Sequence, residues 1–193
     1  MRIDYLTPEN MNEGQRRLYE SINSGERGKR ATLTNDDGAF VGPFNAWLYS
    51  PAIGERVQLL GEALRFHNSL PQNLLELAIL MIGREWRAQF EWWAHEFLAR
   101  RAGLSDEIIA DIKNGVRPEG AKPEELVIYD FCQDLLDRKR VSDEKYQRTK
   151  DLIGENGIVD LVSLMGYYTI VSMTLNVFEV PLPEGQTLPF DES

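Results

Sequence analysis

The chain has 193 residues, 42% of them hydrophobic, and this length predicts one domain spanning 1–193. The 31 acidic and 21 basic residues give a net charge of −10, which repels polyphosphate, so we expect no nucleic-acid partner. No apolar run approaches the roughly 20 residues of a membrane span and no signal peptide is evident, so a cytoplasmic protein with no membrane partner is expected. One cysteine, Cys132, and two histidines predict neither an intrachain disulfide nor a metal site.

The first 42 residues divide into an amphipathic helix over about 8–23 and a polar, glycine-rich stretch over 24–42. We interpret the stretch as a loop, which is either a lid over a site or disordered. Its basic residues and glycines do not make a phosphate-binding loop, because the Gly-Lys-Ser/Thr ending and a preceding strand are missing.

From Pro43 onward the apolar residues recur with helical spacing, and the predicted class is all-α. The expected helices begin at Pro51 and continue with 71–86, 88–102, a short one through about Lys113, 124–138, 142–153 and 159–178, before a tail that is extended after Pro181. Residues 74–82 are apolar on all sides of the helix, which suits a helix at the centre of the protein or one buried between subunits.

Glu76 is the one charged residue within 74–82, among leucines and isoleucines. A carboxylate in such surroundings is costly unless it is paired, hydrogen-bonded or protonated. A buried carboxyl tuned toward neutral pH suits a general acid or base. The alternative is a structural glutamate paired with an arginine such as Arg84 or Arg87.

Glu91 and His95 follow at i and i+4, so they lie on one face of the predicted helix 88–102. An isolated pair of this kind is often a surface contact. The aromatic residues around it favour burial instead, which would place two titrating groups on one cleft wall. These aromatic residues are Phe90, Trp92, Trp93 and Phe97.

Three segments, together with Glu76, resemble the carboxymuconolactone decarboxylase family within the alkylhydroperoxidase D-like superfamily. They are 46–51 (Ala-Trp-Leu-Tyr-Ser-Pro), 89–95 (Gln-Phe-Glu-Trp-Trp-Ala-His) and 102–104 (Ala-Gly-Leu). The resemblance implies an all-α, alkylhydroperoxidase D-like fold in which helices 71–86 and 88–102 form a central antiparallel pair that brings Glu76 near His95.

The resemblance also implies an organisation of the chain and an assembly. An N-terminal helix and loop (1–42) would precede a decarboxylase-like core (43–115), and a helical extension (116–193) would follow it. Family members usually form trimers or hexamers, so we expect a homo-oligomer, and the apolar helix 74–82 would suit burial between its subunits.

Thiol chemistry is disfavoured by two departures from the family's peroxidase branch. That branch implies a Cys-x-x-Cys pair, and its positions fall on Ala88 and Glu91 here. Neither residue can attack a peroxide or resolve the product. A peroxidase would therefore need Cys132, which we interpret as a core residue.

The decarboxylase branch implies acid/base chemistry without a cofactor. By resemblance His95 is the proton donor or base, Glu76 its partner and Glu91 a possible third member, and the substrate is a small carboxylate or lactone. Decarboxylation, or a related lyase, isomerase or hydrolase step, would then occur at this site. A non-catalytic oligomeric binding protein of the same fold is the alternative, with Glu76 and His95 as a satisfied polar network.

Five further residues are candidates for binding this substrate. Arg84 or Arg87 would clamp a carboxylate, or else pair with Glu76 or Glu91. Three aromatic residues would form an apolar pocket wall, or else belong to the core: Trp47, Tyr49 and Trp92. Tyr167 and Tyr168, in the apolar helix 159–178, would form a second wall or a subunit contact.

Overall fold

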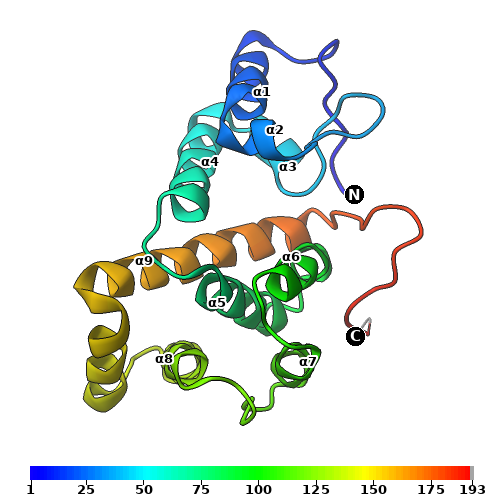
Figure 1. The fold of residues 1–193 in the computed structure, drawn as a ribbon. Coiled ribbons are helices and arrows are strands. Elements are labelled where there is room, and N and C mark those ends of the chain that lie inside the picture. The colour runs from blue at the N-terminus through cyan, green and yellow to red at the C-terminus, as the bar shows by residue number, and fades with distance from the viewer. Residues whose placement is uncertain (192–193) are drawn as a thin grey trace.

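The computed structural model describes residues 1–191, and these fold into nine α-helices without a named strand (Figure 1), so the predicted all-α class is confirmed. The helices are α1 (Glu13–Ser24), α2 (Glu26–Arg30), α3 (Phe44–Leu48), α4 (Pro51–Phe66), α5 (Gln72–Glu85), α6 (Gln89–Arg101), α7 (Asp106–Asn114), α8 (Pro123–Arg138) and α9 (Asp143–Val177).

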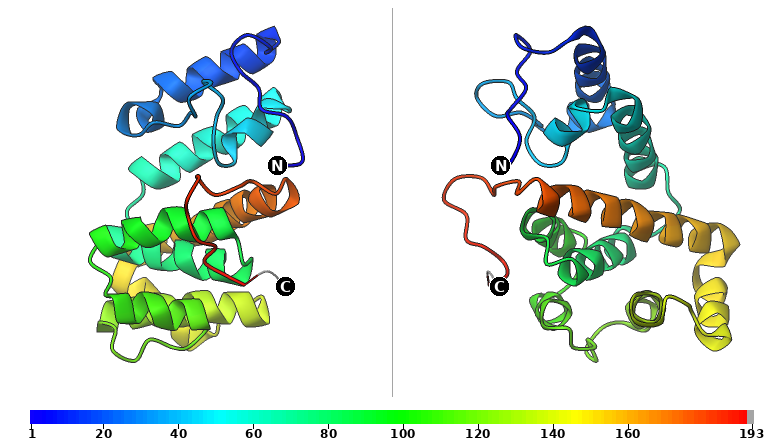
Figure 2. Two further views of the ribbon diagram at one scale, coloured as in Figure 1. Left: turned by 90° about the vertical axis from the view of Figure 1, so that its right-hand side faces the viewer. Right: turned by 180° about the vertical axis from the view of Figure 1, so that it is seen from behind.

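Helix α5 lies at the centre of the fold and packs against α6, α7, α8 and α9 (Figure 2). Ten consecutive residues, 74–83, are buried on all sides of this helix. Burial within one chain therefore accounts for the apolar pattern, and a subunit interface is not needed to explain it. Glu76 is among the buried residues, so α5 carries a carboxyl group into the core.

The N-terminal helices α1 to α4 form a layer that lies across α9 from α5 in both views (Figures 1 and 2). Asn12 begins α1 with a capping box, and the buried Leu18 and Ile22 anchor the helix. The stretch 24–42 is not the structureless loop that its composition suggested, because it contains α2 and a bridge between Thr34 and Phe40. Helix α2 has five residues, too few to show a helical period in the sequence.

Helix α9 bends at Gly154, whose backbone (φ 72°, ψ 176°) is not helical. The break separates the two helices that the sequence predicted here, and the second begins at 155 instead of 159. By length and composition alone α9 could cross a membrane, although we expected no such segment. One such helix is weak evidence for a span, and half of its apolar window is buried inside the protein, which says little either way.

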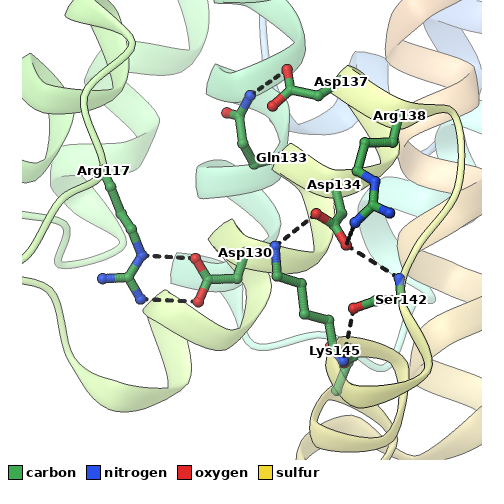
Figure 3. A network of polar contacts seen from close by, with 9 residues as sticks. Arg117, Asp130, Gln133, Asp134, Asp137, Arg138, Ser142 and Lys145 are labelled. Atoms are coloured by element: carbon green, nitrogen blue, oxygen red, sulfur yellow. Dashed lines mark hydrogen bonds and ion pairs between the residues drawn. The ribbon is translucent and has the colours of Figure 1, made fainter.

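Hydrogen bonds and ion pairs of charged side chains stabilise the turn between α8 and α9 (Figure 3). Asp134 accepts hydrogen bonds from Lys145 Nζ at 2.7 Å and from the backbone N–H of Ser142 at 3.2 Å. Nearby, Arg117 donates from Nε and Nη2 to the two carboxylate oxygens of Asp130, at 2.8 and 2.9 Å. These contacts fix the turn and hold the preceding loop against α8.

The tail after α9 is extended and returns to α6. Phe190 packs edge-on against Trp92, and Gln89 forms hydrogen bonds with both the N–H and the carbonyl of Phe190. The tail therefore covers the beginning of α6.

Candidate functional site

Glu76 connects three helices through hydrogen bonds to both carboxylate oxygens. Its Oε2 lies 2.7 Å from Nδ1 of His95 on α6. Its Oε1 accepts from Arg65 Nη1 at 2.6 Å, on α4, and from Gln72 Nε2 at 2.8 Å. The carboxylate is fully buried, so these bonds replace the water that it loses.

The charge state of Glu76 follows from these partners. Burial raises the pKa of its carboxyl group, but His95 and Arg65 outweigh burial and lower the pKa to about 2. Glu76 is therefore ionised at neutral pH and has no proton to donate. Because of this, the proton in the contact with His95 sits on Nδ1, and Nε2 is the nitrogen left to exchange a proton.

Glu91 approaches His95 from the other side of the imidazole ring. Its Oε1 lies 3.2 Å from His95 Nε2 but makes no hydrogen bond to any of residues 1–191. Burial raises the pKa of Glu91, and the negative charge of Glu76 raises it further, against the opposing effect of His95. His95 thus lies between two carboxyl groups whose pKa values are displaced in opposite directions, an arrangement found where one group must stay charged and the other must hold a proton.

Two tyrosines of α9 complete the surroundings of His95. The ring of Tyr168 packs edge-on against the imidazole, with 5.1 Å between ring centroids, and Tyr167 packs edge-on against Tyr168 at 5.2 Å. Burial raises the pKa of Tyr168, and that of Tyr167 to about 12, so both stay neutral at physiological pH. Tyr168 therefore contacts His95, and Tyr167 lies behind Tyr168.

Arg65 is a member of the site that the sequence analysis missed. It follows Gly61 by four residues on α4, and a Cβ at Gly61 would overlap with the hydroxyl and ring of Tyr167. The glycine thus allows α4 to approach α9 closely, and the next turn of the same helix face brings Arg65 to Glu76. The sequence signal for this close contact was a pair of small residues on one face of the helix, Gly54 and Gly61.

A pocket of about 450 Å³ adjoins Glu76 and Arg65, whereas His95 and Glu91 are not among its lining residues. It is lined by Glu76, by hydrophobic residues of α4 and α6, and by three arginines, Arg30, Arg65 and Arg101. The pocket is therefore positively charged at its wall, although the protein as a whole carries a charge of −10. Such a wall favours an anionic ligand.

Arg84 and Arg87 do not take either of their expected places. Arg87 has a left-handed backbone (φ 46°) in the turn after α5, and its guanidinium donates to the carbonyl of Asp191. Arg84 lies beside Gly115. Burial raises the pKa of Tyr129, and the positive charge of Arg84 opposes this effect. Neither pairs with Glu76 or Glu91, because the tail binds Arg87 and the end of α7 lies against Arg84; Arg65 takes the place beside Glu76.

The three predicted aromatic wall residues are also placed differently from the expectation. Tyr49 is 45% exposed and donates its hydroxyl proton to the carbonyl of Asp4, so it is not a pocket wall. Trp47 is buried, with its ring centroid 6.4 Å from that of Tyr167, behind the site. Trp92 is fully buried and packs edge-on against Phe190 of the tail, so it is a core residue.

Cys132 is fully buried on α8, and burial strongly raises the pKa of its thiol. A thiolate is the reactive form in peroxide reduction, so this cysteine is unsuited to that chemistry. Within the described residues, no group of three or more His, Cys, Asp or Glu is arranged to hold a metal ion.

Comparison with known proteins gives no match: no family model matches the chain, and no curated protein matches its sequence. The resemblance to the carboxymuconolactone decarboxylases therefore stays a prediction. It depends on the sequence motifs that carry Glu76, Glu91 and His95.

Proposed function

We propose that the protein is a cofactor-independent acid/base enzyme of the carboxymuconolactone decarboxylase type, acting on a small carboxylated lactone or a related acid. The observation that carries the proposal is the position of His95 between an ionised Glu76 and a Glu91 of raised pKa. The negative charge of Glu76 faces Nδ1 of His95, and Glu91, whose pKa is raised by burial, lies 3.2 Å from Nε2.

Decarboxylation of an unsaturated lactone acid makes two demands on such a site. The bond between the ring carbon and the carboxylate breaks, and its electron pair enters the conjugated lactone as a dienolate while CO₂ leaves. The site must stabilise this negative charge and then return one proton to carbon. In our proposal the proton comes from the His95 and Glu91 pair, and Arg65 contributes positive charge.

The binding of an anionic substrate is supported by the pocket. Arg30 and Arg101 line its wall together with Arg65; Arg65 is paired with Glu76, and Arg30 is paired with Glu26 at the surface. A carboxylated substrate would therefore be drawn to this group of arginines, although the protein as a whole is net-negative.

The non-catalytic alternative accounts for Glu76 but not for Glu91. A structural polar network satisfies its buried groups, as Glu76 is satisfied by three partners. Glu91 Oε1 is buried beside the histidine without a hydrogen bond to residues 1–191, which costs stability. A group retained at such a cost favours catalysis or ligand binding over a purely structural role.

The test is lactone consumption and CO₂ release from 4-carboxymuconolactone by the wild type, His95→Ala and His67→Ala. His67 is the matched control, because it is the other histidine of the chain and is exposed at the end of α4. We expect turnover by the wild type and His67→Ala, and its loss in His95→Ala. Turnover retained by His95→Ala overturns the role of His95, and a folded wild type without turnover rejects decarboxylation of this substrate.

A further inference from the structure

Ser172 of α9 carries a buried hydroxyl without a polar partner. The side chain is fully buried, and its Oγ forms no hydrogen bond with any of residues 1–191. A serine or threonine hydroxyl inside a helix is often satisfied by the carbonyl four residues earlier. Thr149 and Thr174 of the same helix bond in this way, each at 2.8 Å. Ser172 does not, so its hydroxyl must find a partner outside its own helix.

Helix α9 runs antiparallel to α6, and two contacts fix how the two helices are aligned. Tyr168 packs against the imidazole of His95, with 5.1 Å between the ring centroids. About two turns further along α9, Asn176 donates from Nδ2 to the carbonyl of Trp86, which lies just before α6, at 2.7 Å. A step forward along α9 therefore corresponds to a step back along α6.

This alignment places Ser172 opposite Glu91. Ser172 lies one turn after Tyr168 on the same face of α9, and Glu91 lies one turn before His95 on the same face of α6. Because the helices are antiparallel, Ser172 stands to Glu91 as Tyr168 stands to His95. The Oε1 atom of Glu91 is likewise buried and forms no hydrogen bond with residues 1–191. Two polar groups without partners therefore face each other between α6 and α9.

Space for a small molecule is open beside Glu91, where Gly83 of α5 has no side chain. A Cβ at this glycine would lie 3.6 Å from the backbone nitrogen of Trp92 and 3.7 Å from Cγ of Glu91, which are ordinary van der Waals contacts. Helix α5 packs against both α6 and α9. A volume about the size of a methyl group is therefore free next to Glu91, and a water molecule is of similar size.

One water molecule is able to satisfy both groups. A hydroxyl donates and accepts, and a carboxyl group keeps the capacity to accept whether it is ionised or protonated. A buried water typically forms about three hydrogen bonds to polar groups that are otherwise unsatisfied, and leaving such groups dry costs stability. Nε2 of His95 lies 3.2 Å from Glu91 Oε1, so it is a third polar atom beside this position.

We propose that one buried water bridges Ser172 Oγ and Glu91 Oε1, and that Ser172 is thereby a positioning residue for the Glu91 carboxyl. The water adds a neutral contact from α9 that holds this carboxyl beside His95 Nε2. The water site itself does not depend on the reaction, whereas its effect on turnover rests on the proposed function. The charged groups that act on Glu91 lie on four helices: His95 on α6, Glu76 on α5, Arg65 on α4 and Arg27 on α2.

Crystal structures and infrared spectra of the wild type, Ser172→Ala and Thr174→Val test the water site without turnover. Thr174→Val is the matched control, because it removes a hydroxyl of α9 that is bound to its own helix. The carbonyl stretch of protonated Glu91, identified by its loss in Glu91→Gln, reports the hydrogen bond to this group between about pH 4 and pH 8. We expect an ordered water on both atoms in the wild type and in Thr174→Val. In Ser172→Ala the water should be lost, the carbonyl stretch should shift to higher frequency, and kcat/KM for the lactone should fall about tenfold.

The proposal is overturned if no water lies within hydrogen-bonding distance of both atoms in the wild type, or if Ser172→Ala leaves the carbonyl stretch unmoved. Circular dichroism of each variant establishes that it is folded. If the water and the shift are found but no lactone is consumed, the proposed decarboxylation fails and the water site stands. If the wild type consumes the lactone and Ser172→Ala does so with unchanged kcat/KM, Ser172 is not a positioning residue and the reaction stands.

Discussion

His95 Nδ1 and Glu76 Oε2 lie 2.7 Å apart, although nineteen residues separate them in the chain. The contact joins α6 to α5 inside the core, where neither group has water to replace it. The ionised carboxylate places the ring proton on Nδ1, so that Nε2 faces the buried Glu91. The two helices thereby define the direction in which a proton is able to move.

Replacing Glu76 by glutamine should remove activity and stability together. The amide keeps the shape, but it leaves the half-buried Arg65 without a counter-ion and removes the negative charge that faces His95. We expect kcat to fall by about 10² or more and the free energy of unfolding to fall by about 3 kcal/mol. Urea denaturation and lactone turnover measure the two effects.

The matched control for that variant is Gln72→Ala, which removes one neutral hydrogen bond to the same Glu76 oxygen from an exposed residue. It should cost about 1 kcal/mol and leave most of the activity. Equal turnover by Glu76→Gln and the wild type would exclude a role for Glu76 in proton transfer.

The stability of the protein should depend on pH through Glu76. Its pKa falls from an ordinary 4.5 in the unfolded chain to about 2 in the folded protein, so the folded state favours the ionised form. This contribution is fully present above pH 5 and disappears as the pH falls from about 4.5 to about 2; it amounts to about 3 kcal/mol. Urea midpoints between pH 7 and pH 3 should therefore fall more steeply for the wild type than for Glu76→Gln. Parallel curves would contradict the lowered pKa.

Glu91→Gln should stabilise the protein while it lowers activity. Burial raises the pKa of Glu91, so the cost of ionising it in the folded state grows as the pH rises above the ordinary value of 4.5. A neutral amide avoids that cost, so the gain should be larger at pH 8 than at pH 5. Thermal unfolding at both pH values measures it, with Glu96→Gln, on the same helix and paired with Arg100 at the surface, as the control. A destabilised Glu91→Gln would contradict the raised pKa.

The sequence predicted the elements that depend on local pattern. The apolar run around Glu76 and the i, i+4 spacing of Glu91 and His95 placed these residues on helices, and the structure brings the three side chains together. The roles proposed for them are not decided by that proximity. These residues were recognisable because a charged residue within an apolar run is visible in the sequence of a single helix.

The arginines were not predictable in the same way. Arg65 reaches Glu76 only because α4 packs across α9, and no local sequence pattern predicts a contact between such distant segments. Arg87 was misleading because it is close to Glu91 in sequence. It ends α5 in a left-handed conformation where glycine is usual, and its side chain turns away to the tail.

Two glycines that flank the site should respond to alanine in opposite directions. A Cβ at Gly61 would overlap with the hydroxyl and ring of Tyr167, whereas one at Gly166, on the adjoining turn of α9, meets nothing within 4 Å. Gly61→Ala should lose about 1–3 kcal/mol through the displaced tyrosine. Gly166→Ala should gain about 0.5–1 kcal/mol from its helix propensity. Melting temperatures compare the two, and equal shifts would mean that α4 and α9 do not pack this closely.

An exposed apolar stripe on α9 is where we expect copies of the chain to associate. Its members recur at helical spacing on one face and are at least 41% exposed: Val159, Val162, Ile170, Met173 and Val177. A pocket of about 510 Å³ continues the same surface and is lined by Val162, Trp86 and Leu135 among others. A continuous apolar surface of this kind is typical of an interface.

Light scattering should therefore give a multiple of the chain mass for the wild type, with a trimer or hexamer as the expectation from the family resemblance. The double variant Val162→Glu with Met173→Glu should shift the protein toward monomers, because it places two charges in the centre of the stripe. Val116→Glu, which changes an equally exposed apolar residue outside α9, should leave the assembly intact. A wild type that is monomeric at every concentration would show that the stripe does not join copies of this chain.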